Sequence, residues 1–263
     1  MCLVALAWRA HPRYALALIA NRDEFHARPS APAGPDPEDP DVYGGRDLQA
    51  GGSWLLASAR GRLAVVTNVR VGPRGEGAPR SRGALVRGFV RAHDPAPAHL
   101  DALAPEAAGY GPFNLLAWDG ETLGFAGNHP RFATHAVAAG VHAMGNGEFD
   151  DAWPKSSHAT QALAAWLASP AAHADPLAAG TIAPLFAALA DATPAPDAAL
   201  PDTGVGLAVE RMLSAPFVRA PDYGTRCSTV VLVEADAITF VERRFGVEAR
   251  PLGETATRLA RLR

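Results

Sequence analysis

Two short apolar runs open the chain. The first extends from Cys2 to Trp8 and the second from Tyr14 to Ala20, and the segment 10–13, which contains a proline, separates them. Alternate residues of a strand point to opposite faces, and in both runs both faces are apolar. This pattern is typical of strands that are covered on both sides. We therefore expect a β-hairpin inside a layered structure.

The register of this hairpin decides what lies beside the amino terminus. A turn centred between residues 11 and 12 would place Cys2 opposite Asn21. A slip of one or two residues would place it opposite Arg22 or Asp23 instead. In each of these registers the thiol lies close to a guanidinium and a carboxylate.

The same patterns predict the other elements. Residues 27–41 contain five prolines and are expected to form a loop. Ser81 is the expected N-cap of a helix that ends near residue 93. Further strands are predicted at 54–57, 63–69, 113–118, 122–126, 141–144, 225–234 and 237–243, and further helices beginning at 153 and covering 181–189 and 205–213.

Strands gather early and late in this order, with helices between them, which favours an α+β layered fold. A length of 263 residues is sufficient for one domain, and we treat 1–263 as a single unit. The pattern itself supports only a two-sheet or helix-covered antiparallel core.

Composition excludes several classes of function. The net charge of −3 does not suggest binding to nucleic acid or to an anionic membrane. No apolar run approaches the roughly 18 residues of a membrane span, and the amino terminus lacks the features of a secretory signal. Two cysteines do not form a disulfide framework, so we expect a cytoplasmic protein. A single lysine against 23 arginines indicates a GC-rich bacterial genome.

Cys2 is the first candidate for chemistry. Removal of Met1 would leave an α-amine and a thiol on one residue, the arrangement of an N-terminal nucleophile. Arg22 would favour the reactive thiolate. The alternative is that Cys2 is a small buried apolar residue at the start of a strand.

The cluster Asn21-Arg22-Asp23-Glu24 is the second candidate. Three consecutive charges at the end of an apolar strand need partners, and Arg226, at the start of a Val-rich strand, could pair with Asp23 or Glu24. The alternative is a solvated turn with a surface ion pair between Arg22 and Glu24.

Motifs along nearly the whole chain resemble those of the NRDE family, which includes the transport and Golgi organisation protein of eukaryotes. They are Met1-Cys2, Asn21-Arg22-Asp23-Glu24, Gly51-Gly52-Ser53-Trp54, Thr67-Asn68-Val69-Arg70, Ser81-Arg82-Gly83, Trp153-Pro154-Lys155 and Gly224-Thr225-Arg226-Cys227-Ser228-Thr229. The family is in turn similar to N-terminal nucleophile hydrolases of the bile-salt hydrolase and penicillin V acylase type.

This resemblance implies a four-layer αββα sandwich and hydrolysis of a non-peptide C–N amide bond. It assigns catalytic roles to Cys2, Arg22, Asp23, Glu24, Asn68, Asn146 and Arg226. Cys2 would attack, Arg22 would lower the thiol pKa, and Asn68 and Asn146 would stabilise the oxyanion. Arg22 and Asp23 are adjacent here and face opposite ways on a strand, so the functional carboxylate is either Asp23 or Glu24. Alternatively, Asn68 is simply a turn-forming residue that ends a strand.

Four further residues are expected to contact the substrate: Asn21, Trp54, Arg70 and Arg82. Arginines 70, 74, 80 and 82 flank a Gly- and Pro-containing stretch that is either a lid or a solvated loop, and together they would suit an acidic substrate. By alternation Cys227 faces away from Arg226. If Arg226 points at Cys2, Cys227 points into a packed layer and cannot form a disulfide with Cys2.

A binding function on the same scaffold is the alternative to hydrolysis. Eukaryotic members of the family are associated with haem and lipid homeostasis, and in a haem-handling protein Cys2 would be an axial thiolate ligand. The sequence shows no Cys/His spacing typical of zinc and no phosphate-binding or dinucleotide-binding motif, so we expect no metal. It leaves the oligomeric state open.

Overall fold

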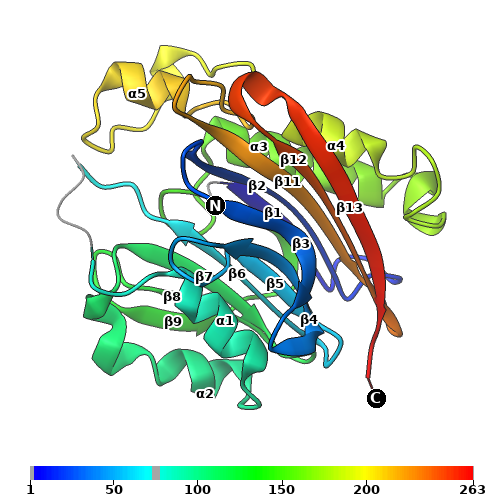
Figure 1. Cartoon of the computed structure of the whole chain (residues 1–263). Helices are drawn as coiled ribbons and strands as arrows, with labels where there is room; N and C mark the ends of the chain where they lie inside the picture. Colours follow the sequence, from blue (N-terminus) through cyan, green and yellow to red (C-terminus); the bar gives the residue numbers. More distant parts are fainter. Residues whose placement is uncertain (1–2, 73–77, 263) are drawn as a thin grey trace.

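The computed structural model describes residues 3–72 and 78–262. In this part of the chain two antiparallel sheets pack face to face, and helices cover both outer faces (Figure 1). The first sheet contains, in spatial order, β10 (Gly140–Met144), β1 (Leu3–Trp8), β2 (Leu16–Phe25), β11 (Tyr223–Val233), β12 (Ala237–Phe245) and β13 (Pro251–Ala260).

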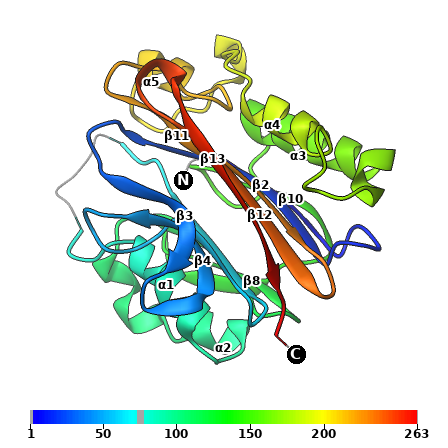
Figure 2. The ribbon, with the colours of Figure 1, turned by 45° about the vertical axis from the view of Figure 1, so that its right-hand side comes forward.

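The second sheet is continuous in sequence apart from one helical insertion. Its order is β3 (Ser30–Asp36), β4 (Asp39–Asp47), β5 (Leu55–Ser58), β6 (Arg62–Asn68), β7 (Phe113–Trp118), β8 (Leu123–Gly127) and β9 (Ala133–Ala136). Figure 2 shows the hairpin of β3 and β4 at one edge of this sheet, beside the long C-terminal strand β13.

Helices α1 (Gly83–Arg91) and α2 (Ala96–Asp101) cover the second sheet, whereas α3 (Pro154–Leu167) and α4 (Ala183–Leu189) cover the first. A short helix, α5 (Leu207–Met212), precedes β11. Single 3₁₀ turns occur at Ala104–Gly109, Pro170–His173, Asp197–Ala199 and Val247–Ala249. None of the described helices combines the length and apolar character needed to span a lipid bilayer.

Three apolar layers hold the sandwich together. Alternation along β1 explains how one strand serves two of them: Val4 and Leu6 face the layer between the sheets, while Leu3 and Ala5 face α3 and α4. The third layer lies between the second sheet and α1, where Phe89 is fully buried. The four-layer αββα sandwich is therefore confirmed.

Two predictions about this fold were wrong. Residues 27–41 form the β3–β4 hairpin rather than a loop, because β3 is an edge strand and can accommodate proline where no ladder hydrogen bond is needed. The second concerns the start of α1, which begins at Gly83 with Arg82 rather than Ser81 in the N-cap position, although the Ser81 hydroxyl accepts a hydrogen bond from the Gly83 N–H at 3.3 Å.

The structure also decides between the two interpretations of the Asn21–Glu24 cluster. It lies within β2, which extends to Phe25, and not in a turn after the strand. The strand continues because β11 pairs with it along its whole length on the other side, so its backbone groups remain satisfied.

Candidate active site

One end of the sandwich gathers the predicted site residues. A single row of paired residues crosses four neighbouring strands: Met144 on β10, Val4 on β1, Ala20 on β2 and Thr229 on β11. Arg22 lies two positions beyond this row on β2, and Asn146 lies two positions beyond it after β10. Asn68, at the end of β6 in the other sheet, is hydrogen-bonded to Asn146.

Cys2 lies outside the described residues. The first described pair of the β1–β2 ladder is Leu3 opposite Asn21, which corresponds to the hairpin register with a one-residue slip. The pairing of Leu3 fixes which part of β2 adjoins the start of β1.

Arg22 is buried between the two sheets, with 4% of its surface exposed. Its guanidinium carbon lies 4.2 Å from the centre of the Trp54 ring, and its Nη2 is 3.8 Å from Glu24 Oε2. Glu24 also lies 3.8 Å from Arg28 Nε. A buried cation on an aromatic face, with a carboxylate at long range, creates a positive potential at the end of β2.

Asp23 faces the opposite side of β2, as alternation predicts. Its Oδ1 accepts a hydrogen bond from Thr225 Oγ1 at 2.6 Å, and the same hydroxyl accepts one from the main-chain N–H of Val218 at 2.9 Å. Asp23 is thereby linked to β11 and the segment before it, whereas Glu24 is the carboxylate that contacts Arg22.

Asn21 is part of the scaffold and was wrongly predicted to contact the substrate. It is fully buried, and both hydrogens of its amide are donated to the carbonyls of Leu189 and Pro216, each at 2.8 Å. Its Oδ1 accepts a hydrogen bond from Ser228 at 2.6 Å. No donor is left for a ligand.

Asn68 and Asn146 lie together, although they come from different sheets. Asn146 donates from Nδ2 to the main-chain carbonyl of Asn68 at 2.8 Å, and its own carbonyl accepts from the Arg70 N–H at 2.7 Å. Lys155, in the first turn of α3, is buried, and its Nζ lies 3.5 Å from Asn146 Oδ1 and donates to the Leu213 carbonyl at 3.0 Å.

Arg226 has partners other than the carboxylates we expected. Its Nη1 donates to the main-chain carbonyls of Phe25, His26 and Arg28 at 2.8, 3.1 and 3.2 Å. The ladder of β2 and β11 shifts register at this residue, which turns its side chain toward the segment after β2. Burial, and then the nearby charge of Arg22, lower the pKa of Arg226.

The arginines after β6 do not converge on one point. Arg70 forms an ion pair with Glu210 at 2.7 Å and donates to Thr203, while Arg80 pairs with Glu106. Arg82 donates to the carbonyl of Pro112 at 3.1 Å. Arg74 lies outside the described residues.

Cys227 lies opposite Arg22 on the inner face of the first sheet and is buried between the sheets, as predicted. Burial raises the pKa of its thiol well above the ordinary value, and the nearby negative charge of Glu242 raises it further. Cys227 is therefore a neutral thiol at physiological pH and a poor nucleophile.

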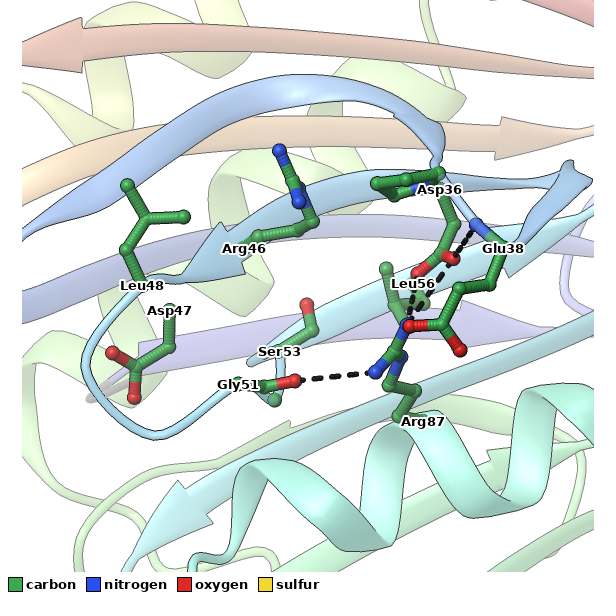
Figure 3. Close-up of a pocket in the computed structure, with 11 residues that line it drawn as sticks. Asp36, Glu38, Arg46, Asp47, Leu48, Gly51, Ser53, Leu56 and Arg87 are labelled. Atoms are coloured by element: carbon green, nitrogen blue, oxygen red, sulfur yellow. Dashed lines mark hydrogen bonds and ion pairs between the residues drawn. The ribbon is translucent and has the colours of Figure 1, made fainter.

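A pocket of about 230 Å³ opens beside α1 and the loop after β4. Figure 3 shows Asp36, Glu38 and Arg87 meeting at one end of it, with Arg87 bonded to both carboxylates, and Asp47 at the other end. Asp47 pairs with Arg28 at 2.6 Å. The pocket contains none of the predicted catalytic residues, and these charges largely neutralise one another.

The described parts of the chain contain no preformed metal-binding site. Residues 3–72 and 78–262 hold no group of three or more His, Cys, Asp or Glu side chains placed to bind a metal ion.

Among solved structures, the Caenorhabditis elegans ortholog of N-acylethanolamine-hydrolyzing acid amidase is similar to this chain. The match has a TM-score of 0.51 at 9% sequence identity and covers 88% of this chain and 92% of that one. At this identity the similarity shows the fold alone, which is that of the N-terminal nucleophile hydrolases.

The family described as Transport and Golgi organisation 2 matches residues 1–246. The Homo sapiens homolog of transport and Golgi organization protein 2 is 34% identical over 264 residues, and that of Bos taurus is 34% identical over 261 residues. Each alignment covers 92% of this chain and 92% of the relative. This chain belongs to the transport and Golgi organisation 2 family.

Sequence reasoning missed three side chains that the fold brings into the site: Thr225, Glu242 and Lys155. Glu242 directly follows the largely apolar stretch 237–241, and Lys155 is the single lysine of the chain. Glu242 and Lys155 could therefore have been recognised from the sequence, since a charged residue in a buried element needs a specific partner.

Proposed function

We propose that this protein hydrolyses a non-peptide C–N amide bond with Cys2 as an N-terminal nucleophile, exposed by removal of Met1. The observation that carries the proposal is the buried Arg22 on the strand beside β1, within a fold used by N-terminal nucleophile hydrolases. Leu3 pairs with Asn21, so β1 begins beside the part of β2 that carries Arg22.

In the first half-reaction the Cys2 thiolate attacks the amide carbonyl carbon, and its α-amine holds the thiol proton. The tetrahedral intermediate then breaks its C–N bond, the leaving amine takes that proton, and a thioester remains. Water attacks the thioester in the second half-reaction, releasing the carboxylic acid and restoring the thiol. The positive charge of Arg22 favours the thiolate by lowering the thiol pKa.

Asn146 and Asn68 are the proposed donors to the oxyanion. One hydrogen of the Asn146 amide is used by the Asn68 carbonyl, and the second hydrogen of this NH₂ group is available for the negative oxygen. The side-chain amide of Asn68 is half-buried at the end of β6, beside Asn146. Both donors would act on charge that develops during the reaction.

Asp23 and Arg226 would maintain the geometry of the groups around the nucleophile. Asp23, which accepts a hydrogen bond from Thr225, is the candidate to orient the α-amine. Glu24 is the candidate to compensate part of the positive charge of Arg22. Arg226 holds the segment that follows β2. A thiol nucleophile must stay reduced, so we place the activity in a reducing compartment such as the cytoplasm.

The experiment is covalent trapping. The protein is incubated with a panel of N-acyl amides, including N-acylethanolamines, for which the solved relative is named, and its peptides are then mapped by mass spectrometry. An acyl group on Cys2 that persists in Cys227→Ala and disappears in Cys2→Ala supports the proposal. If no amide of the panel modifies Cys2, hydrolysis is rejected. A Soret shift on haem titration that depends on Cys2 would then indicate a haem-handling protein instead.

A further inference from the structure

A small cavity lies between the two sheets, directly beside Arg22. Its volume is about 10 Å³, close to the roughly 10–15 Å³ that one water molecule needs. Arg22 and Cys227 from the first sheet and Trp54 from the second line it, together with Glu242 of β12.

The strand pairing explains why these side chains meet. Arg22 lies opposite Cys227, and Glu242 lies opposite Thr229, two positions further along β11 and therefore on the same face. Trp54 approaches from the other sheet, and its indole lies against the backbone of Gly45, where an added Cβ would come within 2.1 Å of the ring.

Four polar atoms that line this cavity have no hydrogen-bond partner among the described residues. One is Nε of the partly exposed Arg244, and the other three belong to nearly fully buried residues: Nη1 of Arg22, Nε1 of Trp54 and Oε2 of Glu242. The three residues are 4%, 5% and 0% exposed. Buried polar atoms are nearly always paired in folded proteins, with protein groups or with ordered water. Three unpaired atoms around one cavity point to a shared partner.

The chemistry of the three atoms defines that partner. Two are N–H donors and one is a carboxyl oxygen, which is the set that a water molecule satisfies by accepting two hydrogen bonds and donating one. The other Glu242 oxygen already accepts from the Ala33 N–H at 2.8 Å, so the carboxyl group is fixed.

We propose that an ordered water molecule in this cavity bridges Glu242 to Arg22 and Trp54, and that Glu242 and Trp54 are positioning residues for the Arg22 guanidinium. The consequence for Cys2 rests on the proposed function, whereas the water and the conformation of Arg22 do not.

Electrostatics supports this coupling. Burial raises the pKa of Glu242, and the charge of Arg22 is among the groups that oppose this rise. The two side chains therefore interact electrostatically without a direct ion pair, since Arg22 forms its ion pair with Glu24. A bridging water would transmit this interaction as hydrogen bonds.

A crystal structure that resolves ordered water tests the first part of the proposal. We expect a water within hydrogen-bonding distance of all three atoms in the wild type. Glu242→Gln keeps an acceptor and should retain the water, whereas Glu242→Leu should lose it and shift Arg22. Trp54→Phe keeps the aromatic face but removes one donor, so the water should move toward Arg22 and Glu242. An empty wild-type cavity, or an unmoved Arg22 in Glu242→Leu, overturns the proposal.

The pH dependence of Cys2 alkylation by iodoacetamide tests the second part. In Glu242→Leu we expect the thiol pKa to rise by about one unit, seen as a roughly tenfold lower rate at neutral pH, and Glu242→Gln should restore most of the rate. An unchanged profile in Glu242→Leu removes the positioning role. An ordinary thiol pKa in the wild type would count against the proposed function, while the crystal structure would still decide about the water.

Discussion

Asn146 donates a hydrogen bond from its side-chain amide to the main-chain carbonyl of Asn68 at 2.8 Å, which joins the end of β10 in one sheet to the end of β6 in the other. The amide oxygen of Asn146 faces the ammonium group of Lys155. A cation on one side and a carbonyl on the other together fix the orientation of the amide.

Replacing Lys155 with methionine should therefore slow the acylation of Cys2 by its substrate. Asn146→Ala removes the donor itself, and its rate should fall by about 10²–10³. Lys155→Met leaves the donor in place but frees the amide to rotate, so we expect a smaller decrease. The measurement is the single-turnover acylation rate, with urea unfolding to confirm that both variants fold. A wild-type rate in Lys155→Met would show that the lysine does not orient Asn146.

The hydroxyl group of Thr225 should contribute substantially to the free energy of unfolding. Its hydroxyl bridges Asp23 and the N–H of Val218 in a fully buried position. Thr225→Val keeps the shape but removes the hydrogen bonds that the hydroxyl makes to both groups, which should lower the free energy of unfolding by about 1–3 kcal/mol. Thr225→Ser retains the hydroxyl and serves as the matched control in urea denaturation. Equal stability of the two variants would contradict this role.

Arg226 should control the backbone after β2. In Arg226→Gln the carbonyls of Phe25, His26 and Arg28 lose a charged donor, whose hydrogen bonds typically contribute about 1.5–3 kcal/mol. We expect amide hydrogen exchange at residues 25–28 to become at least about tenfold faster. The exposed Arg250→Gln is the control. Unchanged exchange at 25–28 would mean that β2 and β11 hold this segment without Arg226.

Ionisation of Asp47 should make the free energy of unfolding depend on pH. Burial raises its pKa, but hydrogen bonds from Arg28 and the Gln49 N–H outweigh this effect, so the pKa of Asp47 is lower in the folded state. The stabilisation is therefore present above the unfolded pKa of about 3.9 and is lost as the pH falls through the folded pKa.

Asp47→Asn should accordingly be less stable than the wild type at pH 7, by about 1–3 kcal/mol, and the difference should shrink as the pH falls below about 3.9. Urea unfolding across this range measures it, with the exposed Asp222→Asn as control. A difference that is independent of pH would assign the loss to packing rather than to the ion pair.

Local periodicity was sufficient for most of the fold. The hairpin of β7 and β8 and the helices α3 and α4 follow directly from their apolar patterns. The pattern failed where tertiary position outweighs local preference. The proline-rich β3 is a strand because it lies at an edge, and β13 was missed because its largely exposed positions have no apolar face.

The site was predictable to the extent that its residues stand at the ends of predicted strands. Arg22, Asn68 and Asn146 stand at such ends, but it was the family resemblance that assigned Asn68 and Asn146 to the same site as Arg22. Their partners could not be predicted, because pairs such as Thr225 with Asp23 or Trp54 with Arg22 join residues from distant parts of the chain. Only the register between strands decides which of them meet.

The central claim is that Cys2 is the amino-terminal residue of the working protein. The intact mass of protein purified from its native source, measured without prior chemical treatment, tests this most directly. The account predicts a mass lower by one methionine residue, with a free α-amine on Cys2. A mass that retains Met1 would contradict it, because the amine of Cys2 would then be held in a peptide bond and could not carry the proton.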